Sequence, residues 1–161
     1  MTRITNTIRI TRPIEEVFAF VTTPANWPTW HLASLSIAGN VDHSLLVGEE
    51  VIEEFRAAGR RGRATWRVTR RDVPQLWTIE TSAQGGRATI VYRLRADRGE
   101  TLFERELTYA MPSLWLALLD VILLRRRMRR ESRAALQRLK EVLEMAVSQG
   151  RTRPTEPTLA R

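Results

Sequence analysis

The sequence predicts an α+β fold in which a strongly curved, seven-stranded antiparallel sheet wraps around one long C-terminal helix. Segments in which apolar and polar residues alternate recur along residues 3–111, as expected for half-buried strands. Short turns separate most of these segments, so neighbouring strands should pair as antiparallel hairpins. The helical pattern over 113–148 is far longer than the usual helix of about 11–12 residues, so it needs a partner surface of matching length.

The N-terminal part of the chain is predicted to hold a strand, two short helices and a second strand. Alternation predicts a strand over residues 3–11, in which Asn6 is the polar exception on the apolar face. Pro13 and Pro24 each begin a short helix, because proline is suited to the first helical position. A short strand is then expected at 34–37, after a segment rich in tryptophan.

Turn signals divide the middle of the chain into five further strands. Gly59-Arg60-Arg61-Gly62 is interpreted as a hairpin turn, because no helix follows to make it a phosphate-binding loop. Pro112 ends the last strand, and Ser113 is expected to cap the long helix. The five strands are predicted at 49–57, 63–72, 76–83, 87–96 and 101–111.

Length and composition favour one domain over 1–149, followed by a polar tail at 150–161 that is predicted to be disordered. The absence of cysteine excludes disulfides, thiolate catalysis and cysteine-ligated metals. The two histidines make a poor metal site, and no nucleophile elbow or phosphate loop is present, so we expect no metal and no cofactor. No signal peptide is recognised, and a cytoplasmic location is expected.

The net charge of +8 favours acidic partners in a non-specific way, but no motif predicts a specific nucleic-acid partner. The apolar run 114–124 is too short to span a membrane, which takes about 20 residues. It is interpreted as a buried helix. The alternative is an interfacial helix that contacts an anionic membrane, with the arginine-rich segment 125–130 as its collar.

Four segments together resemble a known superfamily. They are residues 10–18 at the first strand–helix junction, 26–30 in the second helix, 48–50 at a strand start, and 136–144 near the end of the long helix. The chain resembles the START-like helix-grip proteins, also called SRPBCC, and within them the polyketide cyclase/dehydrase-like branch. The resemblance implies a helix-grip fold with an apolar cavity between sheet and helix that binds a hydrophobic small molecule.

Alternation predicts which side chains line that cavity. Three polar residues, Glu53, Thr81 and Arg105, fall on the apolar faces of their strands. Glu53 and Arg105 could form a salt bridge, read the ligand together, or reach solvent through a bulge or strand end. The head of Arg125 could likewise reach water from a buried stem. The candidate ligand-binding residues are Trp30, Phe55, Trp66, Trp77, Tyr92, Phe103, Arg105, Tyr109 and Arg125.

Function is predicted as binding of a lipid or polyketide-like molecule. One alternative is a polyketide cyclase/dehydratase-like enzyme, which requires a cavity residue with a perturbed pKa. Its catalytic candidates are His31, Glu53, Tyr92 and Tyr109, although His31 could equally be a hydrogen-bonded structural residue. The other alternative is a lipid-transfer or membrane-surface protein, which requires exposure of Leu116, Leu119 and Leu123. The sequence leaves open whether the protein is a monomer or a homodimer.

Overall fold

Seven strands form one antiparallel sheet in the computed structural model, in the order β1-β7-β6-β5-β4-β3-β2. The structure describes residues 1–57, 60–83, 86–110 and 125–150. The elements are β1 (Thr2–Ile10), α1 (Ile14–Thr22), the 3-10 turn η1 (Pro24–Asn26), α2 (Trp27–Trp30), β2 (Ser34–Gly39), β3 (Glu50–Ala57), β4 (Arg60–Asp72), β5 (Leu76–Ala83), β6 (Gly86–Asp97), β7 (Glu100–Ala110) and α4 (Arg125–Gly150).

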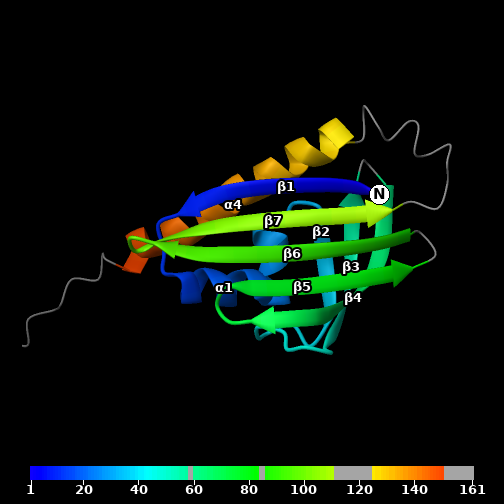
Figure 1. The fold of residues 1–161 in the computed structure, drawn as a ribbon, viewed down its shortest axis with the longest axis horizontal. Coiled ribbons are helices and arrows are strands. Elements are labelled where there is room, and N and C mark those ends of the chain that lie inside the picture. The colour runs from blue at the N-terminus through cyan, green and yellow to red at the C-terminus, as the bar shows by residue number, and fades with distance from the viewer. Residues whose placement is uncertain (58–59, 84–85, 111–124, 151–161) are drawn as a thin grey trace, which may run out of the picture.

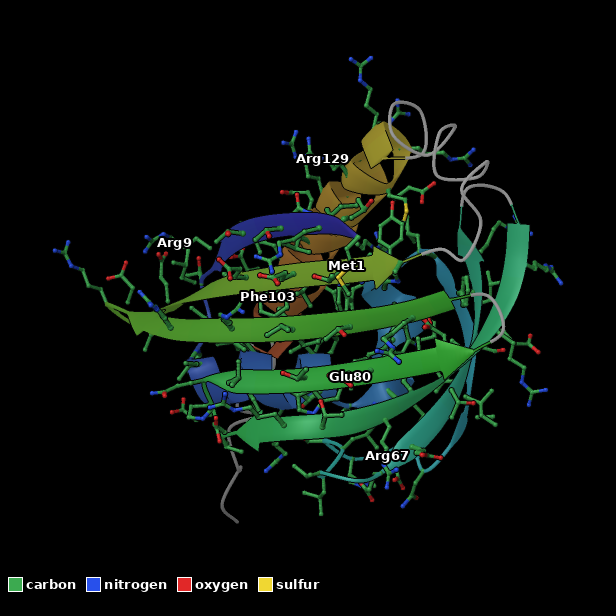
Figure 2. The ribbon with its side chains drawn as sticks, turned by 45° about the vertical axis from the view of Figure 1, so that its right-hand side comes forward. Met1, Arg9, Arg67, Glu80, Phe103 and Arg129 are labelled. Atoms are coloured by element: carbon green, nitrogen blue, oxygen red, sulfur yellow. The ribbon has the colours of Figure 1, made fainter. Side chains whose placement is uncertain are left out.

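The helices cover one face of the curved sheet. Figure 1 shows α4 running along β1 while α1 lies behind β5 and β6, on the same side of the sheet. Charged side chains such as Arg67, Glu80 and Arg129 are exposed (Figure 2). The predicted order of one strand, two short helices, six strands and a C-terminal helix is confirmed, as is the α+β class.

Two local predictions were wrong. Gly62 is not in a turn, because β4 begins at Arg60 and Gly62 pairs with Phe55 of β3. The aromatic ring of Phe55 lies over the space that a side chain at position 62 would occupy. Glycine is therefore needed there for β4 to pack closely against the Phe55 side chain of β3. Pro13 is not the first helical residue either: its ψ of 146° is extended, and α1 begins at Ile14.

The strand faces follow the predicted alternation. Val51, Trp66, Ile79 and Phe103 are all buried on their strands. Register shifts between Ser34 and Ser36, and between Val68 and Arg70, are irregularities of the kind that increase the twist of a sheet.

An aromatic cluster fills the core between sheet and helices. Tyr92 stacks on Trp77 with ring centroids 5.3 Å apart, and Phe103 meets Tyr92 edge-on at 5.1 Å. Trp27 of α2 approaches Trp77 edge-on from the helical layer at 6.1 Å. Such pairs add to the apolar burial that stabilises the fold.

Helix α4 packs through a stripe at helical spacing and is fixed to the N-terminal strand. Lys140 Nζ donates to the carbonyl of Arg9 at 2.8 Å, and Thr11 N donates to Glu144 at 2.8 Å. The predicted helical segment 113–124 lies outside the described residues. None of the described helices is long and apolar enough to cross a membrane. The buried stripe consists of Ser132, Ala135, Leu136, Leu139 and Leu143.

Candidate functional site

A small cavity of about 20 Å³ lies between α2 and the covered face of the sheet. This volume is enough for about one water-sized group. Strands β3 to β7 each contribute to its wall, so the curvature of the sheet brings together residues far apart in sequence. The lining residues are Trp27, Trp30, His31, Glu53, Trp66, Ile79, Ile90, Tyr92 and Arg105.

Glu53 brings a carboxyl group into this mainly apolar wall. Only 7% of the residue is exposed, and its carboxylate accepts a 2.7 Å hydrogen bond from the Trp66 indole N–H. Burial raises the pKa of Glu53, although Ser34, Trp66 and the charge of Arg105 act in the opposite direction. The protonated form of Glu53 therefore persists to higher pH than that of an exposed glutamate.

Arg105 of β7 is the buried cation of the site and is only 4% exposed. Its Nη1 donates to the Ser132 hydroxyl of α4 at 3.3 Å, and the same hydroxyl accepts from Asn6 Nδ2 at 2.8 Å. Among the described residues, no carboxylate forms an ion pair with Arg105. Glu53 and Arg105 are thus both buried without a direct salt bridge, and neither reaches solvent at a bulge or strand end.

His31 and Tyr92 complete the titratable groups of the cavity. The His31 residue is partly exposed, and its ring meets Trp30 edge-on at 5.6 Å. Burial of the imidazole, together with the charge of Arg105, lowers the pKa of His31 to about 3. Burial raises the pKa of Tyr92, opposed by Arg105. At neutral pH both groups are therefore uncharged, and Arg105 carries the positive charge of the site.

The fold and the chain match one family of known proteins. The profile of the family described as polyketide cyclase/dehydrase and lipid transport matches residues 1–144. The chain belongs to this family. The family forms part of the SRPBCC, or START-like helix-grip, superfamily, so the resemblance seen in the sequence is confirmed. A comparison with curated proteins finds no match.

Solved structures show the same fold in proteins of low sequence identity. A Thermus thermophilus protein has a TM-score of 0.74 at 15% identity, with 90% of this chain and 99% of that chain covered. A Rhodobacter sphaeroides protein has a TM-score of 0.67 at 21% identity, with 90% of this chain and 93% of that chain covered. A protein from the dynemicin biosynthetic locus has a TM-score of 0.65 at 14% identity, with 89% of this chain and 48% of that chain covered.

The structure of this polyketide cyclase/dehydrase family member brings together six of the candidates named from the sequence. Among the others, Trp77 and Phe103 pack behind Tyr92, whereas Phe55 is partly exposed over Gly62. Tyr109 is buried on β7 but does not line the cavity. The side chain of Arg125 is not among those that the structure describes. The six that line the cavity are Trp30, His31, Glu53, Trp66, Tyr92 and Arg105.

The hydrogen-bond partner of Arg105 was not predicted from the sequence. Ser132 is that partner, because its hydroxyl accepts from Arg105, and Asn6, near the other end of the chain, donates to the same hydroxyl. Both had a visible signal, since each is a polar residue that interrupts an apolar face. Ile79 and Ile90 also line the cavity, although neither was among the candidates named from the sequence. The described residues contain no group of three or more His, Asp or Glu side chains that could hold a metal ion.

Proposed function

We propose that this protein binds a hydrophobic or aromatic small molecule, lipid-like or polyketide-like, between the sheet and α4. The observation that carries the proposal is the buried pair of charged residues, Glu53 and Arg105, in an aromatic wall. Ligand sites are mainly apolar and contain a few polar groups that fix orientation. The family, whose description names polyketide cyclase/dehydrase and lipid transport, supports the same class of ligand.

The size of the cavity limits how a ligand would bind. Drug-sized ligands occupy pockets of about 300–1,000 Å³, whereas the described residues enclose about 20 Å³. We infer that a polar end of the ligand occupies this space. Side chains of the wall would then move to admit the apolar body, and those of α2 are the best placed, because this four-residue helix ends at the partly exposed His31.

Native mass spectrometry of protein from its own host tests the proposal. We expect a retained hydrophobic molecule, which extraction and fragmentation would identify. Ile90→Phe should reduce the retained amount at least severalfold, because Ile90 lines the cavity. Val91→Phe, on the opposite face of the same strand, should leave it unchanged. A clean apo mass, with no uptake of added lipids or aromatic polyketides, would contradict the proposed function.

Catalysis is the alternative that a specific observation favours. His31, Glu53 and Tyr92 face one cavity, and the pKa of each departs from its ordinary value, as active sites often require. The neutral His31 could accept a proton, and Glu53, whose pKa is raised, could donate one when it is protonated. If so, incubation with linear poly-β-ketones should yield cyclised or dehydrated products, and Glu53→Gln should reduce their rate of formation.

The remaining assignments are predictions. The lipid-transfer or membrane-surface alternative depends on Leu116, Leu119 and Leu123, which lie outside the described residues. A single domain over 1–149, the cytoplasmic location, and the choice between monomer and homodimer also stay predictions. Size-exclusion chromatography with light scattering would determine the oligomeric state.

A further inference from the structure

Two buried N–H groups of the cavity wall have no hydrogen-bond partner among the described residues. They are Nε of Arg105, a residue only 4% exposed, and Nε1 of Trp30, a residue only 1% exposed. Both side chains line the same cavity. Buried donors without acceptors are rare in native proteins, because they lose water without replacement. Their shared position indicates that an acceptor enters between α2 and β7.

The charge of the cavity specifies what kind of acceptor fits. A guanidinium has five N–H donors and no acceptor, and Ser132 gives Arg105 a neutral oxygen only. Glu53 acts on Arg105 from beyond ion-pair distance, and its carboxylate accepts the Trp66 N–H. His31 and Tyr92 are uncharged at neutral pH. The positive charge of Arg105 therefore has no anion in direct contact among the residues described.

We propose that Arg105, assisted by the Trp30 indole N–H, binds an anionic oxygen of the ligand, and that the ligand is therefore an apolar acid. A carboxylate, or a similar oxygen on an aromatic or aliphatic body, accepts short charge-assisted hydrogen bonds from a guanidinium. The inference rests on the proposed function and deepens it by naming the ligand class. Neutral esters and alcohols of the same shape would leave the guanidinium without an anion.

The arginine-rich start of α4 does not provide an equivalent site. Arg126, Arg127 and Arg130 are exposed, and Arg127 pairs with Glu131 at 2.9 Å. Charges in water attract anions only weakly and are screened by salt. Arg105 is instead buried among aromatic side chains, where the same interaction is stronger. The buried arginine therefore determines the specificity.

Calorimetric titration with two matched pairs of probes tests the proposal. The pairs are naphthoic acid with methyl naphthoate and dodecanoic acid with methyl dodecanoate. We expect at least one acid to bind the wild-type protein about tenfold or more tightly than its ester, as one charge-assisted contact allows. Arg105→Met should reduce acid affinity to that of the ester. The control Arg95→Met, which replaces an exposed arginine of β6, should change neither.

A second variant keeps the test independent of the folding of the first. Trp30→Phe removes the indole N–H but keeps an aromatic ring, and it should weaken acid binding severalfold with little effect on the ester. A crystal structure with the bound acid should place a carboxylate oxygen within hydrogen-bond distance of Arg105 Nε. A water molecule retained there at saturating acid would overturn the proposal.

The outcomes separate this inference from the proposed function. If acid and ester bind the wild-type protein equally, hydrophobic binding stands and the role of Arg105 as an anion-binding residue is wrong. If Arg105→Met retains the preference for the acid, the inference is likewise overturned. If none of the four probes binds, the inference fails, and native mass spectrometry of the host-purified protein decides the proposed function separately.

Discussion

Buried charge dominates the chemistry of this protein at the scale of single residues. Burial raises the pKa of Glu53 and lowers that of His31, and the positive charge of Arg105 opposes the first shift and reinforces the second. A carboxyl group that stays protonated to higher pH and a neutral imidazole thus coexist beside one guanidinium.

The raised pKa of Glu53 predicts a pH-dependent cost to stability. The folded protein holds the proton of the Glu53 carboxyl more tightly than the unfolded chain does, so unfolding releases that proton above pH 4.5. The contribution of Glu53 to the free energy of unfolding therefore falls as pH rises. Glu53→Gln keeps an acceptor for the Trp66 N–H. The melting temperature of this variant relative to wild type should therefore increase from about pH 4.5 to 8, which calorimetry can measure.

A neighbouring glutamate provides the control for this measurement. Glu54 follows Glu53 on β3 and is exposed, so Glu54→Gln also removes one negative charge but leaves the cavity unchanged. Three groups act on the pKa of Glu53 from other elements: Ser34 of β2, Trp66 of β4 and Arg105 of β7. Equal pH trends in the two variants would show that the effect comes from net charge and not from burial.

At the scale of elements, the packing stripe of α4 decides how the helix closes the core. Ser132, Ala135, Leu136, Leu139 and Leu143 repeat at three- and four-residue spacing, so they form one face. The polar member, Ser132, is the one that meets Arg105. The helix thus contributes both the apolar cover of the sheet and the hydroxyl group that holds the buried cation.

Truncation of Leu139 should show the energetic weight of this stripe. The residue is 0% exposed, and Leu→Ala at such a site costs about 2–5 kcal/mol through lost burial and a cavity. Urea unfolding should show this loss for Leu139→Ala. Arg138→Ala, at the exposed neighbouring position, should change stability by about 0.5 kcal/mol or less. Similar values for the two variants would mean that α4 is not packed as described.

At the scale of the whole molecule, the N-terminal strand β1 and the C-terminal helix α4 pack against each other. β1 is the edge strand beside β7, and α4 packs along it. Lys140 donates to the Arg9 carbonyl, Thr11 N donates to Glu144, and Lys140 and Glu144 are 2.7 Å apart. The junction between β1 and α1 is therefore fixed to the last helix by three linked polar contacts.

Removal of Glu144 should loosen this connection without unfolding the protein. Glu144→Ala deletes the acceptor of Thr11 N–H and the partner of Lys140. Both contacts are partly exposed, so we expect a loss of about 1 kcal/mol. Hydrogen exchange should become faster at the Thr11 amide. Amides in the centre of the sheet should change only by the amount that the loss of global stability produces. Glu141→Ala, exposed on the same helix, is the control, and equal exchange in both variants would contradict the role of Glu144.

The order of elements along the chain and the buried faces of the strands were predictable because they depend on local pattern. A period of two along a strand fixes which side chains share a face, so Glu53 and Arg105 could be assigned to the apolar face before the structure was known. The hairpin between β3 and β4 is confirmed, but its turn was placed too far along the chain, because Arg60, Arg61 and Gly62 belong to β4. Two glycines suggested a turn, whereas Gly62 is required by the ring of Phe55 on the neighbouring strand.

The α+β class, the order of elements, the buried faces and the family all follow from patterns in the amino-acid sequence. Three features required the tertiary structure: Glu53 and Arg105 lie in one cavity without pairing, the Ser132 hydroxyl accepts from both Arg105 and Asn6, and the cavity is water-sized. The reason is physical. Alternation is set by neighbours in the chain, whereas distances between β1, β3, β7 and α4 are set by the twist of the sheet and by how the core packs.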